Sequence, residues 1–316
     1  MVIRKINRKE VYYSNPTQLT TCILKWLYQL LSKQSKYLIL DGTTWEAGDK
    51  YIHLLTLCIV YKNVAVPIYW KQLNKKGGHS SQEDRKLLFA EALKIFQLSG
   101  MILIADREFI GENWFRYLTD NQIDFVVRVS KTCYKLPVSK AWGSSHAYLE
   151  KRASKRKSPV GKRFTMGTGC YSFVAVKNTR KDEKEPVLFL VSSLTDFAKI
   201  AAIYKVRWKI ETCFRQLKTK GFNMEDLNFK DDNKIVLMMS VVVMAYVLSI
   251  VKGVKETKVN KPLYKKYRSG QRLLAISLFR IGLSKLKQSV WNLKRFIESL
   301  DEIFRSKPKL STLLVQ

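Results

Sequence analysis

Acidic residues are scarce in this sequence. The chain of 316 residues has 26 Asp and Glu against 57 Lys and Arg, which gives a formal net charge of +31 at pH 7. This surplus exceeds what solubility requires and favours a polyanionic partner, either nucleic acid or an anionic membrane surface. Because the basic residues extend from Arg4 to Lys309, we expect a folded protein with a long electropositive surface, which is typical of nucleic-acid-binding proteins.

Cysteine and histidine are also few. The five cysteines form no CxxC pair and there are only three histidines, so the sequence predicts neither a disulfide framework nor a structural zinc site. The basic N-terminus is not followed by an apolar core with a cleavage site, so no secretory signal is evident. We therefore expect a cytoplasmic protein.

Long apolar runs are absent except at 235–251, where 17 residues carry no charge. That length is at the lower limit for crossing a bilayer. Two serines and a tyrosine interrupt the run, and Lys234 and Lys252 flank it without asymmetry. We expect a fully buried core helix and no membrane span.

The first 130 residues alternate between helical and β patterns. Apolar residues at helical spacing predict an amphipathic helix over 17–34. Apolar, β-rich runs then predict a three-stranded meander over 37–70. A capping pattern from Ser81 to Asp84 predicts the start of a helix. That helix continues over 87–98, and the pattern ends with a strand at 100–105, a helix at 114–121 and a strand at 124–129.

The pattern changes after residue 130. Short β-favouring pieces among Gly, Ser and Lys predict a β-rich insertion, after which helical periodicity resumes at 196–220 and a basic helical tail ends the chain. We therefore divide the chain into a short N-terminal helical segment (1–36), the first part of an α/β catalytic core (37–130), the insertion (131–193), the rest of the core (194–255) and a basic helical C-terminal region (256–316).

Two aspartates follow apolar strands in this pattern. Asp41 and Asp106 each come directly after four or more apolar residues. In a mixed sheet of order βββαβαβ the first and fourth strands lie side by side, so both carboxylates would emerge at a carboxyl edge of the sheet, where ligands bind. Two adjacent carboxylates favour a cation. Taken singly, each Asp is explained as well by a turn that ends its strand.

A third carboxylate lies on a predicted helix. Tyr204, Arg207, Glu211 and Lys218 stand at offsets of 3, 7 and 14 residues. At about 100° per residue these positions share one helix face. Such a stripe would suit phosphate binding, with Glu211 completing a carboxylate trio for Mg²⁺. The alternative is an ion pair from Arg207 to Glu211 on a solvated face.

Four motifs together closely resemble those of a known family, the DDE transposases of the insertion-sequence-four type. The family signature Y-x2-R-x3-E-x6-K is matched at every spacing by Tyr204, Arg207, Glu211 and Lys218. The other similar motifs are DGTTW at 41–45, GGHS at 77–80 and DREF at 106–109. The resemblance covers residues 37–225, and four motifs in the right order are far more specific than any one of them.

The resemblance implies both a fold and a reaction. The fold is α/β, a ribonuclease-H-like mixed sheet flanked by helices, with a β-rich insertion before the Glu helix and a helical C-terminal region. Asp41, Asp106 and Glu211 would be the catalytic residues and would bind two Mg²⁺ ions, which Mn²⁺ can replace. The reaction would be phosphodiester cleavage at transposon ends and joining of the 3′-hydroxyls to target DNA.

The resemblance also implies how DNA is bound. Tyr204, Arg207 and Lys218 match residues that grip transposon-end DNA, and Trp142 in the insertion is a candidate for stacking on a flipped base. The partners would be double-stranded DNA, both terminal repeats and target, and a second copy of the chain. Helices over 17–34 and 270–305 are candidates for the dimer contact. The cytoplasmic protein would then be associated with a prokaryotic nucleoid.

One departure from the family leaves alternatives open. About 36 residues precede the first catalytic strand, which is short for the helical domain with which relatives recognise their ends. End recognition through the insertion and tail is one explanation, and a truncated copy is another. A non-catalytic DNA-binding regulator and an endonuclease of the same fold are the two alternatives to an active transposase.

Overall fold

The first strand organises the sheet. In the computed structural model, β1 (Tyr37–Ala47) pairs antiparallel with β2 (Lys50–Tyr61) on one side and parallel with β4 (Ile102–Ala105) on the other. The strand β3 (Val64–Gln72) pairs antiparallel with β2, and β5 (Asp124–Val129) pairs parallel with β4. The predicted meander and the predicted pairing of the first strand with the fourth are therefore confirmed.

The chain forms two compact units. The sheet unit comprises residues 31–228, and the helical unit comprises residues 1–30 together with 229–316. The five segments predicted from the sequence are not tested by this division and stay a prediction. The structure describes residues 16–31, 35–47, 50–73, 78–130, 145–156, 158–178, 185–226, 231–266 and 272–304.

The predicted insertion extends the same sheet. Its strands β6 (Val160–Met166), β7 (Gly169–Lys177) and β8 (Val187–Ser192) are antiparallel and join the sheet at β5, which gives the order β3-β2-β1-β4-β5-β8-β7-β6. The segment also contains α6 (Ser145–Lys155), a helix that the sequence pattern did not predict. Tyr148 and Leu149 are the only large apolar residues among the eleven of α6, so it lacks the broad apolar stripe by which a helix is recognised in a sequence.

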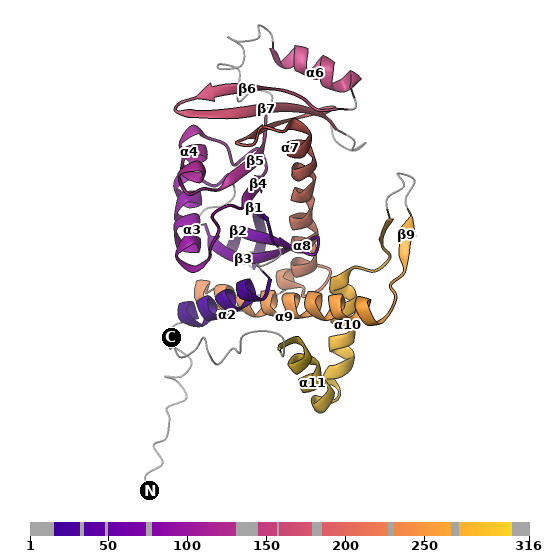
Figure 1. The fold of residues 1–316 in the computed structure, drawn as a ribbon. Helices are drawn as coiled ribbons and strands as arrows, with labels where there is room; N and C mark the ends of the chain where they lie inside the picture. The colour runs from indigo at the N-terminus through magenta and orange to yellow at the C-terminus, as the bar shows by residue number, and fades with distance from the viewer. Residues whose placement is uncertain are drawn as a thin grey trace. The chain divides into compact units, whose positions relative to one another are not determined.

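Helices cover both faces of this sheet (Figure 1). On one face lie α3 (Gln82–Ile95), which begins at the capping box of Ser81 and Asp84 as predicted, and α4 (Glu112–Asp120). On the other lie α7 (Phe197–Tyr204) and α8 (Trp208–Lys218). The α7 side packs on a core of seven buried residues, Ile104, Val126, Val174, Leu190, Ile200, Ile203 and Tyr204. The predicted fold class, a ribonuclease-H-like mixed sheet flanked by helices, is confirmed.

The helical unit contains four helices and a hairpin among its described residues. The helices are α2 (Pro16–Leu31), α9 (Asp232–Val259), α10 (Leu278–Val290) and α11 (Leu293–Phe304). The hairpin pairs β9 (Tyr264–Lys266) with β10 (Arg272–Leu274). The sequence pattern predicts a basic helical tail here, without a hairpin. The strands are only three residues long, too short to show an alternating pattern.

The apolar helix α9 is longer and less buried than expected. It runs over 28 residues and, among the described residues, is the one helix long and apolar enough to cross a membrane. A single helix of this kind is weak evidence for a membrane span, because core helices of soluble proteins share the property. Half of its most apolar stretch is buried and Val241 is 48% exposed. The prediction that this helix is fully buried is therefore wrong, because only half of its most apolar stretch is buried.

Two glycines let α9 and α10 approach closely. A methyl group added at Gly282 would contact the carbonyl oxygen of Ser249, and one added at Gly253 would contact the carbonyl oxygen of Leu278. Both contacts are with backbone atoms, which cannot rotate away as a side chain can.

We expect Gly282→Ala to lower the free energy of unfolding by about 1–2 kcal/mol, because overpacking outweighs the gain in helix propensity. Urea unfolding measures this, with Ser284→Ala on the exposed side of α10 as the control. An unchanged midpoint for Gly282→Ala would show that the two helices separate easily.

Candidate active site

Neighbouring strands bring Asp41 and Asp106 together. The parallel pairing of β1 with β4 ends one residue before each aspartate. Each carboxylate accepts a hydrogen bond from the backbone N–H of the following residue, Gly42 at 2.9 Å and Arg107 at 2.8 Å. These bonds fix the orientation of both carboxylates at one level of the sheet.

Asp41 does not end its strand as the sequence predicted. β1 continues to Ala47, and Asp41 lies opposite Thr56 of β2. The reason is that β2 pairs with β1 along its whole length, whereas β4 stops at Ala105. Asp106 does follow the end of its strand. Asp41 is therefore held within a paired strand, while Asp106 stands at the start of a loop.

The segment that carries Tyr204, Arg207 and Glu211 is not the single helix that the sequence predicted. The helix α7 ends at Tyr204, a 3₁₀ turn occupies Lys205–Arg207, and α8 begins at Trp208. A 3₁₀ turn has fewer residues per turn than an α-helix, so it rotates side chains away from the spacing of 100° per residue. Such breaks often mark functional sites.

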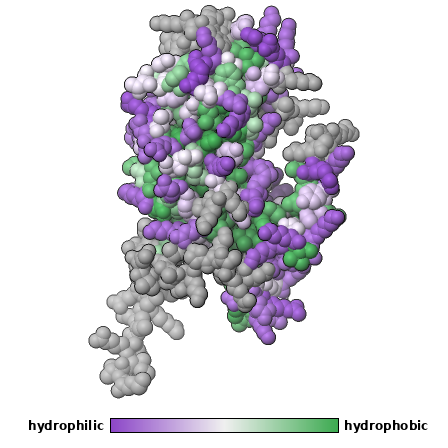
Figure 2. Space-filling model, in the orientation of Figure 1, coloured by the Kyte–Doolittle hydropathy of each residue, from purple (hydrophilic) through white to green (hydrophobic). Residues whose placement is uncertain are grey.

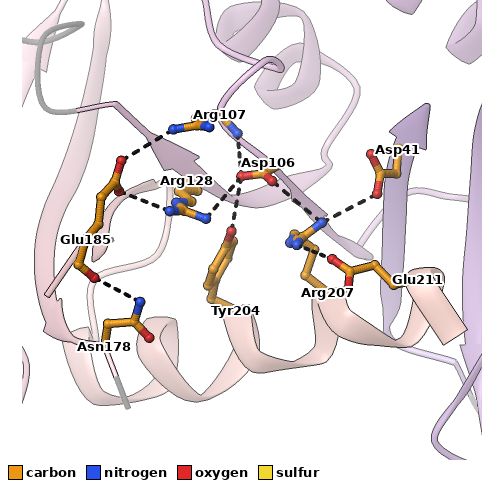
Figure 3. Close-up of polar contacts among 9 residues, drawn as sticks. All are labelled: Asp41, Asp106, Arg107, Arg128, Asn178, Glu185, Tyr204, Arg207 and Glu211. Carbon is orange, nitrogen blue, oxygen red and sulfur yellow. Dashed lines mark hydrogen bonds and ion pairs between the residues drawn. The ribbon is translucent and has the colours of Figure 1, made fainter. Parts of the chain in front are cut away.

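Arg207 contacts all three predicted catalytic carboxylates (Figure 3). Its Nη1 lies 3.4 Å from Asp41 Oδ2 and 3.7 Å from Asp106 Oδ2, and its Nη2 lies 2.7 Å from Glu211 Oε1. Arg207 is only 4% exposed, and its guanidinium lies over the Trp208 ring at 4.6 Å. The ion pair with Glu211 is therefore present, but its Arg207 side is buried and also contacts Asp41 and Asp106, unlike an ion pair on a solvated helix face.

The electrostatics of this cluster are dominated by burial. Burial raises the pKa of Asp41 to about 7. The attraction of Arg207 lowers this pKa only in part, and the negative charge of Asp106 raises it further. Burial alone would lower the pKa of Arg207, but the surrounding charges, first that of Asp106, hold that pKa above its usual value. The guanidinium therefore stays charged, and Asp41 exchanges a proton near neutral pH.

Tyr204 also faces Asp106. Its hydroxyl donates a hydrogen bond to Asp106 Oδ1 at 3.4 Å. Burial, with the nearby charge of Asp106 as the second cause, holds the pKa of Tyr204 well above its usual value. The phenol is therefore a neutral hydrogen-bond donor at physiological pH.

A second basic cluster, which sequence analysis missed, adjoins Asp106 (Figure 3). Arg128 of β5 lies 3.9 Å from Asp106 Oδ1 and 3.0 Å from Glu185 Oε2. Arg107 lies 3.3 Å from the other oxygen of Glu185, and Asn178 donates a hydrogen bond to the Glu185 carbonyl. The available signal was a cation within the apolar strand DFVVRV, because a charge in a buried strand requires a partner.

Arg85 positions the loop that follows Asp106. It is 4% exposed and donates hydrogen bonds to the carbonyl oxygens of Ser80, Glu108 and Ile110. At the same loop, Nδ1 of His79 lies 2.9 Å from Glu108 Oε2. Arg85 thereby connects the predicted GGHS and DREF motifs, of which the structure describes all but Gly77.

Two other predicted residues are not part of the carboxylate cluster. Lys218 donates a hydrogen bond from Nζ to the carbonyl oxygen of Thr44 at 2.7 Å and pairs with Glu225 at 2.7 Å. It thus stabilises the segment after α8 in this structure. Trp142 lies outside the described residues.

The side chains of the carboxylate cluster have ligand chemistry that suits a divalent cation. Among the described residues, no three His, Cys, Asp or Glu side chains already surround a common point as metal ligands, and the Arg207 guanidinium lies between Asp41, Asp106 and Glu211. All three side chains supply carboxylate oxygens, the ligands that Mg²⁺ prefers. The donor chemistry therefore fits a cation that would take over the positive charge of Arg207.

We expect Arg207→Ala to lower the free energy of unfolding by about 3–5 kcal/mol at pH 8, because it leaves buried carboxylates without their counter-charge. The loss should be smaller at pH 5, where Asp41 is protonated. Arg215→Ala, at an exposed position of α8, should change stability by less than about 0.5 kcal/mol. Equal stabilities of the two variants in urea unfolding would contradict the assigned role of Arg207.

A family model described as "Transposase DDE domain" matches residues 32–248. Among solved structures, a cryo-EM structure of the piggyBac transposase synaptic complex with hairpin DNA is similar at a TM-score of 0.49 and 12% identity. The similarity covers 98% of this chain and 66% of that chain, so this chain spans just under two thirds of that transposase. No curated protein matches the sequence.

Proposed function

Because the chain belongs to the family of transposase DDE domains, we propose that it cuts phosphodiester bonds at the ends of a mobile DNA element and joins the 3′-hydroxyls to target DNA. The observation that carries this proposal is the convergence of Asp41, Asp106 and Glu211 on one guanidinium. The signature residues further support assignment to the insertion-sequence-four type.

Asp41, Asp106 and Glu211 would hold two Mg²⁺ ions, for which Mn²⁺ can substitute. When bound, the ions would supply activation of water or a 3′-hydroxyl and stabilisation of the leaving oxygen. Two features of the chain suit these ligands to the task. Asp41 and Asp106 are oriented by backbone N–H groups, and Glu211 at 44% side-chain exposure can approach DNA.

The basic residues of the cluster would hold the DNA. Arg207 neutralises the carboxylates in the structure, and once a cation does so its guanidinium becomes available to a phosphate. Tyr204 can donate its hydroxyl hydrogen to a phosphate oxygen. Arg107 and Arg128 add two cations on the other side of Asp106. Lys218 would also bind a phosphate once its ion pair with Glu225 is broken.

The proposed partners are the double-stranded terminal repeats, the target DNA and a second copy of the chain, because two ends must be joined together. We further propose that Trp142 stacks on a flipped base. The site of action would be the cytoplasm of a prokaryotic cell, at its nucleoid.

The test is an incubation of the full chain with duplex DNA carrying the element's own ends, in Mg²⁺, in Mn²⁺ and in EDTA. We expect nicked and joined products with either metal and none with EDTA or with Asp106→Asn. Cleavage without joining would identify an endonuclease of the same fold. Binding to the ends without cleavage in any metal would identify a non-catalytic regulator and contradict the proposed reaction.

A further inference from the structure

One stretch of the helical unit is free of acidic residues. Residues 257–297 contain no Asp or Glu. The same 41 residues contain eleven Lys or Arg, namely Lys258, Lys261, Lys265, Lys266, Arg268, Arg272, Arg280, Lys285, Lys287, Lys294 and Arg295. They therefore contribute 11 of the 31 net positive charges of the chain, in about an eighth of its length.

The hairpin in this stretch exposes its cations in an unfavourable arrangement. Lys265, Lys266 and Arg272 are all exposed. Lys266 and Arg272 are directly opposite each other across the two strands, and like charges in that position destabilise a hairpin. Within the described part of the chain, neither lysine has an ion-pair partner. The Arg272 guanidinium lies over the Tyr264 ring at 5.5 Å, which supplies no negative charge. Neighbouring cations without a counter-charge among the described residues indicate an external anion.

The neighbouring helix α10 also exposes basic side chains. Arg280, Ser284, Lys287 and Trp291 stand at helical spacing, and all are exposed, Trp291 at 93%. With Ile276 at the base of the hairpin, they line an open groove with a volume of about 560 Å³. Basic side chains beside an exposed aromatic ring are typical of nucleic-acid-binding surfaces.

We propose that the hairpin and this side of α10 form a DNA-binding surface, separate from the carboxylate cluster, that grips the phosphate backbone of duplex DNA. Its residues are Lys265, Lys266, Arg272, Arg280 and Lys287, and we name it the C-terminal basic surface. The proposal rests on the proposed function only in the choice of DNA as the polyanion. Charge complementarity carries it, and the contacts are to phosphates, so the binding is independent of sequence.

Figure 2 shows hydrophilic residues along the hairpin, which Figure 1 labels β9. Apolar residues also lie on this unit, including Leu263 at 79% exposure and Val259 at 82% exposure. An anionic membrane could in principle attract such a mixed surface. The density of cations without any acidic residue, together with the transposase family of the chain, favours DNA.

The experiment measures the salt dependence of DNA binding. The parent is the full chain with Glu211→Gln, which prevents cutting, and the probe is a duplex of arbitrary sequence. The hairpin variant adds Lys265→Gln, Lys266→Gln and Arg272→Gln. Each phosphate contact contributes about 0.9 to the slope of log K against log salt, so we expect the slope to fall by about 2–3 and the affinity at low salt to fall at least about tenfold.

The control removes the same charge from exposed lysines elsewhere, with Lys25→Gln, Lys62→Gln and Lys234→Gln. Its slope should stay close to that of the parent. A second variant, Arg280→Gln with Lys287→Gln, tests α10 independently and should lower the slope by about 2. Each variant should unfold at a temperature no lower than that of the parent, because every altered side chain is exposed and the hairpin substitutions remove like-charge repulsion.

Three results would overturn the inference. Equal slopes for the hairpin variant and the control would mean that the cations act only through net charge. Loss of binding to phosphatidylserine vesicles in the hairpin variant, with DNA binding intact, would assign the surface to membranes. Failure of the parent to bind any DNA would contradict the proposed function as well, which distinguishes it from the other two results.

Discussion

Asp41→Asn should remove DNA cleavage and yet make the metal-free protein more stable at pH 8. The carboxylate is needed to hold the cation, so its loss should reduce the cleavage rate by about 10³-fold or more. When no cation is bound, the ionised carboxylate destabilises the folded protein, because burial raises its pKa to about 7 from the ordinary value of 3.8.

The sign of the pH dependence follows from this shift. The folded protein binds the Asp41 proton more tightly than the unfolded chain does, so stability decreases as the pH rises from about 4 to about 7. The full shift corresponds to about 4 kcal/mol. Because the side chain is 20% exposed and solvent screens part of its charge, we expect a gain of about 1–3 kcal/mol for Asp41→Asn at pH 8.

Thermal unfolding of both proteins in EDTA between pH 4 and pH 8 measures this effect. The two melting temperatures should converge below pH 5 and separate as the pH rises. Adding Mg²⁺ at pH 8 should stabilise the wild type and leave Asp41→Asn nearly unchanged. A variant that is less stable than the wild type at pH 8 would mean that the attraction of Arg207 outweighs the cost of burying Asp41.

Glu211→Gln should abolish cleavage while leaving both folding and DNA binding in place. Glu211 has the most exposed side chain of the three carboxylates, at 44% against 20% for Asp41 and 26% for Asp106. Replacing it with an amide of the same shape should change stability by less than about 1 kcal/mol. We expect a loss of cleavage of about 10³-fold or more with an end-DNA affinity within about threefold of the wild type.

Glu225→Gln provides a matched control. Glu225 accepts an ion pair from Lys218 at 2.7 Å, the same distance as from Arg207 to Glu211, but lies outside the carboxylate cluster. It should keep wild-type cleavage. Gel assays of cleavage and fluorescence anisotropy of end binding measure the two properties. Residual cleavage by Glu211→Gln within tenfold of the wild type would exclude Glu211 as a metal ligand.

Much of the sheet unit could be predicted from the sequence. Strands such as 102–105 and 124–129 are short apolar runs between polar loops, and a buried parallel strand gives that signal whatever surrounds it. The helix start at Ser81 was also evident, because a capping box involves only neighbouring residues. These features depend on local interactions, so a sequence pattern is sufficient to find them.

Local sequence patterns did not predict three other features. These are the continuation of β1 beyond Asp41, the 3₁₀ turn at Lys205–Arg207 and the ion pair of Glu185 with Arg128. The strand continuation and the contact of Glu185 with Arg128 depend on partners elsewhere in the chain. Asp41 stays in a strand because Thr56 pairs with it, and Glu185 is 57 residues from Arg128. Sequence periodicity carries no information about such partners.

The amino-acid sequence alone is enough to predict the α/β class, to show the excess of positive charge and to reveal residue spacings that resemble those of transposases. Composition and local spacing do not depend on how the chain folds, so they are evident in the sequence. The tertiary structure was needed to show that Arg207 is buried between Asp41, Asp106 and Glu211, and that burial of Asp41, which the attraction of Arg207 offsets only in part, raises its pKa to about 7. These contacts join residues as distant as Asp41 and Arg207, which are 166 positions apart, and they exist only after the sheet and the α7–α8 segment have packed together.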